Sequence, residues 1–281
     1  MIGAAVIVLA TVMLLPSTGA PVKGLPAQQP AKDDAIRDLT QKAEAGDAQS
    51  QVQLGLDYVT GDGVAHDDAQ AVKWFRKAAD QDNMLGERYL AEMYFKGRGV
   101  TADNEQAAKW LRFAAGQDDP QSEHNLAVLY LQGLGVPKSG TEAAKWMRKA
   151  ADHDFADGQV GLGAMFEVGD GVRLDEAEAA KWYRKAADQD SRDGMNDLAL
   201  LLVNSKNPTI RNPKEAVALA TKATGKGDNA TYLDTLARTY FETNQYRQAI
   251  EAERKAVALA PSDDSYKNSL EKYLAAVGDT R

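Results

Sequence analysis

Few side chains in this sequence could carry out catalysis or bind a metal. The chain has three histidines and no cysteine. His66, His124 and His153 fall in different segments and at different phases of the sequence pattern, so neither a catalytic triad nor a metal site is expected from them. Each is predicted to be a surface or loop residue. Without cysteine, disulfides, thiolate nucleophiles and cysteine-ligated zinc sites are excluded, and no metal or cofactor is predicted.

Three short motifs suggest chemistry but lack the context that the chemistry needs. Gly-x-Gly-Val loops recur, yet no strand precedes them, so they are not dinucleotide-binding fingerprints. Ser269-x-x-Lys272 matches the nucleophile motif of penicillin-recognising enzymes, but the partner motifs Ser-Asp-Asn and Lys-Thr-Gly are absent. The acidic run at residues 188–194 has Ala199 where a calcium loop needs its closing glutamate. We therefore predict that the protein is not an enzyme.

The net charge of the chain limits its possible partners, and the N-terminal residues indicate its location. The net charge is −8 and the isoelectric point is about 5.0, so unaided binding to nucleic acid or to an anionic membrane is not expected. Residues 2–15 form an uncharged apolar run followed by small residues, which predicts a signal peptide over residues 1–20. No basic residue precedes the run, and an uncleaved membrane anchor is the alternative. A flexible linker is expected over residues 21–32, and the expected location is periplasmic or secreted.

The elements that position these residues repeat with a fixed period. The four tryptophans lie 36 residues apart, and both the Gly-x-Gly-Val loop and a Leu/Gly/Tyr cluster keep that period, which indicates stacked helix pairs. The first helix is expected over about residues 48–58 and ends at a glycine, which tolerates the left-handed conformation. The second helix begins near carboxylates such as Asp67 and carries one apolar stripe. The tryptophans are Trp74, Trp110, Trp146 and Trp182, and the loops span 61–64, 97–100, 133–136 and 169–172.

This pattern resembles the Sel1-like repeat family, whose members are helix-turn-helix relatives of the tetratricopeptide repeat. The resemblance covers four repeats (47–82, 83–118, 119–154 and 155–190), and a degenerate fifth repeat follows over 191–227, with Leu219 near the tryptophan position. Residues 230–263 resemble a tetratricopeptide repeat. Helices over 33–46 and 264–281 are expected to cap the ends. The resemblance implies an all-α fold, a right-handed superhelical α-solenoid of helix-turn-helix repeats.

In relatives of this fold the first helix of each repeat lines a concave groove, which implies a binding surface here. The groove would suit a protein or peptide with apolar anchors and a few salt bridges. The resemblance suggests a monomeric scaffold or regulator of the bacterial envelope, and a cell-wall glycan-binding accessory protein is the alternative. Replacing Arg88 or Phe95 is expected to weaken partner binding and to leave unfolding nearly unchanged. The predicted partner-binding residues are Val52, Leu56, Arg88, Glu92, Phe95, His124, Val128, Leu131, Asn196, Asp234, Arg238 and Phe241.

Overall fold

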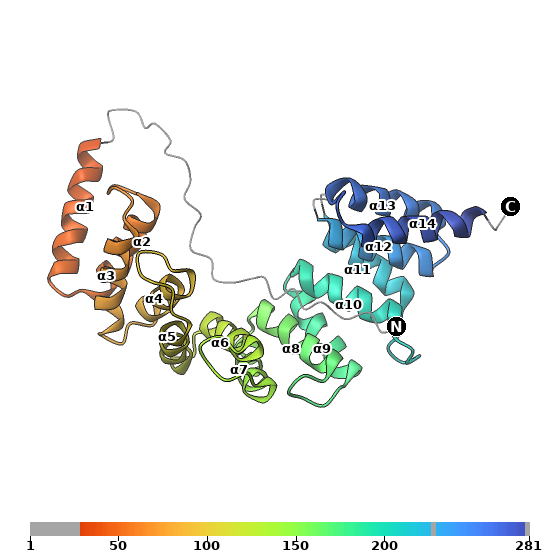
Figure 1. Ribbon diagram of the computed structural model, residues 1–281, viewed down its shortest axis with the longest axis horizontal. Coiled ribbons are helices and arrows are strands. Elements are labelled where there is room, and N and C mark those ends of the chain that lie inside the picture. Colours follow the sequence, from red (N-terminus) through yellow and green to blue (C-terminus); the bar gives the residue numbers. More distant parts are fainter. Residues whose placement is uncertain (1–28, 226–228, 279–281) are drawn as a thin grey trace. The chain divides into compact units, whose positions relative to one another are not determined.

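The computed structural model describes residues 29–225 and 229–278, and within them it contains fourteen α-helices and no strand (Figure 1). The chain divides into two compact units, an N-terminal unit with described residues 29–153 and a C-terminal unit with described residues 154–225 and 229–278. The predicted signal peptide and the predicted linker before Gln29 lie outside the described residues. None of the described helices is both long enough and apolar enough to cross a membrane.

The N-terminal unit consists of one leading helix and three helix pairs. The leading helix, α1 (Gln29–Glu44), begins within the predicted linker, so residues 29–32 are helical. Pro30 is compatible with this start because the first turn of a helix needs no backbone N–H from that residue. The pairs are α2 (Ala48–Thr60) with α3 (Asp68–Ala79), α4 (Met84–Lys96) with α5 (Asn104–Gly116), and α6 (Pro120–Gln132) with α7 (Gly140–Asp152).

The C-terminal unit also contains three helix pairs, followed by a last helix. The turn within its second pair contains no Gly-x-Gly: the first helix ends at Asn204, with Ser205 as its C-cap, and Asn212 caps the second, which starts at Pro213. The pairs are α8 (Ala156–Val168) with α9 (Glu176–Asp188), α10 (Arg192–Asn204) with α11 (Pro213–Thr224), and α12 (Ala230–Glu242) with α13 (Tyr246–Leu259), and the last helix is α14 (Asp264–Gly278).

The helix ends follow directly from the repeated residues. Gly61 ends α2 with a left-handed φ of 75°, and its N–H donates to the Asp57 carbonyl at 2.7 Å. Gly97, Gly133 and Gly169 end the corresponding helices in the same way. The second helices begin at residues whose side chains accept backbone N–H groups, namely Asp67, Asp103, Ser139 and Asp175. The Gly-x-Gly loops are therefore helix-helix turns, as predicted.

The apolar stripes form the core of each unit. Trp74, Trp110 and Trp182 are 9%, 7% and 4% exposed, which confirms that these tryptophans are core residues. Trp146 is half-buried and packs against the core of the N-terminal unit. That core contains Phe75, Val59, Leu90, Leu111 and Leu126, and the core of the C-terminal unit contains Tyr183, Leu198, Leu202, Leu236 and Tyr273.

Candidate binding surface on the first helices

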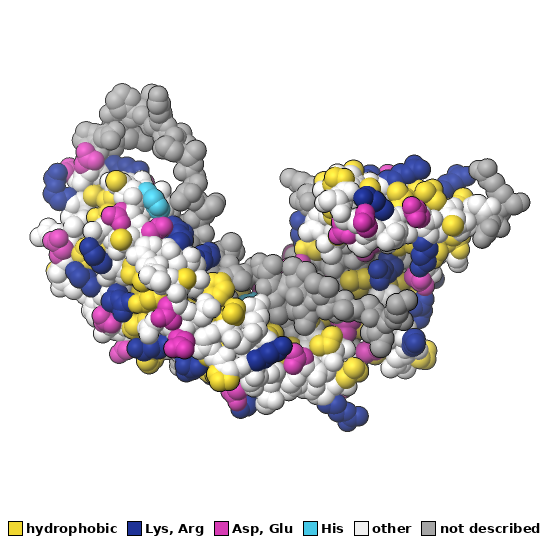
Figure 2. Space-filling view, in the orientation of Figure 1, with side chains coloured by type: hydrophobic (Ala, Val, Ile, Leu, Met, Phe, Trp, Pro, Cys, Tyr) yellow, Lys and Arg dark blue, Asp and Glu magenta, His cyan; other side chains and the backbone are white. Residues whose placement is uncertain are grey.

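Several first helices contact the first helix of a neighbouring repeat within the same unit. α2 contacts α4 in the N-terminal unit, and α10 contacts both α8 and α12 in the C-terminal unit. We refer to the exposed side of α2, α4 and α6, and separately that of α8, α10 and α12, as the first-helix surface of each unit. All of the predicted partner-binding residues lie on these helices. In Figure 2 acidic and basic side chains are interspersed over the visible face of each unit.

Burial divides the predicted residues into two groups. The first group is buried in the structure and has little surface to offer a partner: Val52, Glu92, His124, Val128, Leu131 and Asn196. The second group is partly exposed: Leu56, Arg88, Phe95, Asp234, Arg238 and Phe241. The prediction that every histidine is a surface or loop residue was wrong for His124, which lies within α6 and is 3% exposed. Burial lowers the pKa of His124 to about 4, so its imidazole is neutral near pH 7.

Several of the predicted residues already have partners within the chain. Arg88 donates to the Asp119 carboxylate at 3.1 Å, and Asp119 is the residue that caps α6. Arg88 therefore connects α4 to the start of the next repeat, and its replacement would disturb folding as well as binding. Phe95 and Leu56 pack against the core of the N-terminal unit. The expectation that Arg88 and Phe95 contribute little to stability therefore conflicts with the contacts of both side chains.

In the C-terminal unit, α12 holds a cluster of charged and aromatic side chains. Arg238 lies 3.8 Å from the Asp234 carboxylate, and burial raises the pKa of Asp234. Phe241 stacks on Tyr273 of α14 with 4.7 Å between ring centroids, and the Lys272 ammonium lies 4.9 Å from the Phe241 ring. The predicted residues of α12 thus combine an aromatic side chain with both charges.

Carboxylates gather on the first helices of the C-terminal unit, a feature that the sequence analysis missed. Glu167 accepts a hydrogen bond from the Tyr183 hydroxyl at 2.8 Å, and Asp193 accepts one from Tyr232 at 2.7 Å. Burial, together with the charges of Asp193 and Glu167, raises the pKa of Asp197 to about 7. Asp157, whose pKa is also raised mainly by burial, belongs to the same acidic group.

Two arginines lie on first helices of the same unit, Arg192 on α10 and Arg238 on α12. The Arg192 guanidinium donates through Nε to the Ala223 carbonyl at 2.7 Å and through Nη2 to the Thr224 carbonyl at 3.2 Å. Arg238 is paired with Asp234. A positive charge brought by a partner would favour the ionised carboxylates and would be attracted by them. The first-helix surface of the C-terminal unit is therefore chemically suited to a cationic group.

Comparison with known proteins identifies the repeat. The Sel1 repeat model matches residues 48–83, 85–119, 120–155, 156–191 and 192–228. The chain belongs to the Sel1 repeat family. Scaffolds of Sel1 and tetratricopeptide-like repeats generally mediate protein interactions and are typically non-catalytic. The Sel1 match ends at residue 228, so the helix pair α12 and α13, where a tetratricopeptide repeat was predicted, lies beyond it.

Among the solved structures that are similar to this Sel1 repeat protein, two show the likeness. One is c5321, a protective antigen of uropathogenic Escherichia coli strains with an SLR fold, at 30% identity and a TM-score of 0.55 over 86% of this chain. The chain spans 60% of the length of that antigen. The other is a Sel1 repeat protein from Oxalobacter formigenes, at 23% identity and a TM-score of 0.67 over 88% of this chain and 95% of that one. No curated protein matches the sequence.

The α12 cluster of this Sel1 repeat protein predicts a pH-dependent stability. Glu253 of α13 is 0% exposed, and its carboxyl group interacts with that of Asp234. Burial, followed by the charge of Asp234 and a hydrogen bond with its carboxylate, raises the pKa of Glu253 from 4.5 to about 8. Between these two values the folded chain holds a proton that the unfolded chain releases. The free energy of unfolding therefore falls as the pH rises through this window.

Replacing Glu253 by Gln should remove this loss. We expect Glu253→Gln to have a larger free energy of unfolding than the wild type at pH 8.5. The difference between variant and wild type should be about 2 kcal/mol larger at pH 8.5 than at pH 5.5. Urea unfolding at both pH values measures the difference. Glu251→Gln, on the same helix but exposed, is the matched control and should show no such gain. Equal pH dependence of the wild type and Glu253→Gln would contradict the assignment.

Proposed function

We propose that this Sel1 repeat protein is a non-catalytic binding scaffold or regulator of the bacterial envelope. Its partner is a protein or peptide that lies on the first-helix surface and presents apolar side chains together with at least one Lys or Arg. The observation that carries this proposal is the group of interacting carboxylates on α8 and α10, namely Asp157, Glu167, Asp193 and Asp197.

Burial removes water from these carboxylates, and this loss of solvation is why they would favour a cation from a partner. The raised pKa of Asp197 means that the chain alone stabilises the ionised carboxylate poorly. A guanidinium or ammonium group held against Asp193 and Asp197 would compensate these charges in a partly dehydrated site, where charge-assisted hydrogen bonds are strong. Partner binding should therefore strengthen as the pH rises through about 7, because Asp197 ionises over that range.

Two lines of support concern the location. The apolar run at residues 2–15 is typical of an export signal. The similar Escherichia coli protein is a protective antigen. Fusing residues 1–30 to a reporter enzyme that is active only outside the cytoplasm tests the location. An active fusion supports export, and an inactive one contradicts it.

The binding proposal is tested with charge-neutral variants. The wild type and the double variant Asp193→Asn/Asp197→Asn are used to capture partners from envelope extract, and affinity for the captured protein is then measured with purified components. The double variant should bind at least about tenfold more weakly, because it removes the charges that face the partner's cation. Asn keeps an oxygen that accepts the Tyr232 hydroxyl hydrogen bond, so the fold should be preserved.

The matched control removes the same number of charges from a second helix. Glu178→Gln/Asp188→Asn, both on α9, should bind the partner like the wild type. Equal weakening by both double variants would show a nonspecific effect of net charge and would contradict the proposed surface. Retention of purified cell-wall glycan with no captured protein would instead favour the glycan-binding alternative.

A further inference from the structure

An equivalent side-chain hydrogen bond is present in each of the first four helix pairs, at positions that recur every 36 residues. A residue that follows the second helix bonds to a buried residue in the first turn of the first helix of the same repeat. The bond length is 2.8 Å in repeats one to four. Its members are Gln81 and Gln51, Gln117 and Glu87, His153 and Glu123, and Gln189 and Gln159. In most repeats this bond is made by an amide group, whose only evident task is to satisfy a buried polar side chain.

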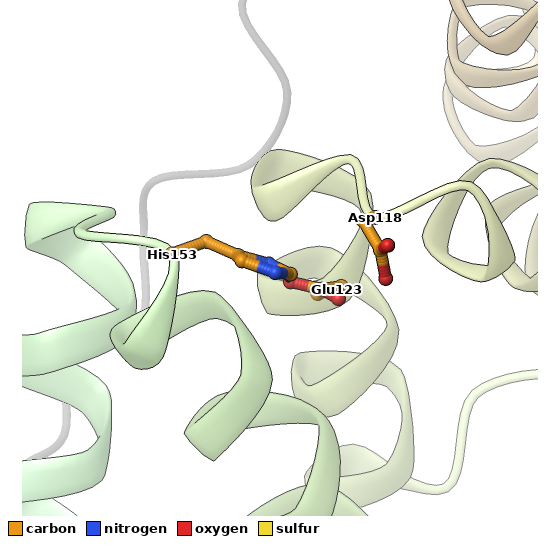
Figure 3. Close-up of side chains that lie close together, drawn as sticks. All are labelled: Asp118, Glu123 and His153. Carbon is orange, nitrogen blue, oxygen red and sulfur yellow. The ribbon is translucent and has the colours of Figure 1, made fainter.

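The third repeat departs from this pattern in its chemistry. His153 stands where repeats one, two and four have glutamine, and its Nδ1 lies 2.8 Å from Glu123 Oε2. Asp118, in the turn before α6, completes a group whose ligand atoms all lie within 4.8 Å of one another. Figure 3 shows the three side chains pointing toward one another from the end of α7, from α6 and from the turn between α5 and α6. Only this repeat, among those described, combines an imidazole with two carboxylates at this position.

One carboxylate oxygen of Glu123 is buried within the cluster without a hydrogen-bond partner. Its side chain is 0% exposed, and Oε1 has no hydrogen-bond partner. Burial raises the pKa of Glu123, although the contact with His153 opposes that rise. Lys149 Nζ lies 3.9 Å from both Glu123 Oε1 and Asp118 Oδ1, which is beyond hydrogen-bond distance, and its side chain is 49% exposed. The lysine compensates the charge at a distance and can turn toward solvent.

We propose that Asp118, Glu123 and His153 form a binding site for a divalent transition-metal ion, with Zn²⁺ the best match. Zn²⁺ binds imidazole nitrogen and carboxylate oxygen, and water can complete its tetrahedral shell. Two carboxylates and one neutral imidazole balance the charge of a dication. Ca²⁺ and Mg²⁺ are poorer matches because they prefer oxygen ligands alone. Bound metal would connect the start of α6 to the end of α7 and stabilise the third repeat.

The test titrates the full chain with ZnCl₂ in a non-chelating buffer and follows heat and thermal unfolding. The wild type should bind one ion at a saturable site, with a rise in the unfolding midpoint. His153→Gln restores the residue found in repeats one, two and four, so it should fold like the metal-free wild type. Its affinity for Zn²⁺ should fall at least about tenfold. His66→Gln, which removes a histidine outside the cluster, should bind like the wild type.

Visible absorption of bound Co²⁺ distinguishes a specific metal site from nonspecific metal binding at the protein surface. Co²⁺ added to the wild type should give the visible absorption bands of a protein-bound ion, and Asp118→Asn and His153→Gln should both reduce them. The proposal is overturned if the wild type shows no saturable binding of Zn²⁺. It is also overturned if His153→Gln binds Zn²⁺ as tightly as the wild type, or if His66→Gln loses binding to the same extent.

Discussion

Replacing Gly99 by alanine should strongly destabilise the N-terminal unit. Gly99 is the second glycine of a Gly-x-Gly loop and has a left-handed φ of 65°. A Cβ atom there would lie 2.1 Å from the Asp68 carbonyl oxygen and 2.6 Å from the Ala69 nitrogen, at the start of α3 in the preceding repeat. Backbone atoms cannot move aside as a flexible side chain can. We expect a loss of at least about 3 kcal/mol, of which about 1 comes from the left-handed conformation and the rest from overpacking.

Thermal and urea unfolding of the full chain measure this loss, and hydrogen exchange locates it in α3 and α4. Gly116→Ala is the matched control, because a Cβ there would meet no heavy atom within 4 Å and the residue ends an α-helix. That control should be neutral or slightly stabilising, by up to about 1 kcal/mol. If Gly99→Ala unfolded like the wild type, the close contact between loop and preceding helix would be refuted.

Replacing Trp110 by alanine should have a comparable effect. The Trp110 side chain is 7% exposed and belongs to the core that joins the second and third repeats of the N-terminal unit. Its loss removes a large buried apolar surface and leaves a cavity that the neighbouring helices fill only in part. Large-to-small changes of this kind cost about 3–5 kcal/mol. Urea unfolding followed by circular dichroism measures the change.

Phe113 offers a control on the same helix. Its ring lies 5.6 Å from that of Trp110 but is 49% exposed. Phe113→Ala should therefore cost less than about 1 kcal/mol. Similar unfolding curves for Trp110→Ala and the wild type would show that the periodic tryptophans are not core residues, contrary to their burial.

The sequence predicts most of the repeat architecture because its markers are local. Gly61 and Asp67 define where α2 ends and where α3 begins, through a left-handed residue and a side-chain cap. These interactions lie within a few residues of one another, so the pattern alone reveals them. The start of α1 at Gln29 was missed because proline in a first turn looks the same as proline in a linker.

The binding surface is less predictable because it depends on how the repeats pack. Indexing by the period places Arg88 and His124 on first helices, but it does not show that Arg88 bonds to Asp119 or that His124 is buried. The acidic group was missed for the same reason. Asp197 and Glu167 lie thirty positions apart, and only the rotation between repeats brings their charges close enough to interact. A sequence signal existed for the third repeat, where His153 replaces a recurring glutamine.

Photocrosslinking in living cells tests the central claim, that the first-helix surface binds a protein. A photoreactive amino acid is placed at Leu56 or Leu200 on first helices, and at Lys73 or Lys181 on second helices as controls. We expect the first-helix positions to crosslink to one and the same envelope protein and the second-helix positions not to crosslink to it. Crosslinks from the second-helix positions alone, or no protein crosslink from either first-helix position, would contradict the claim.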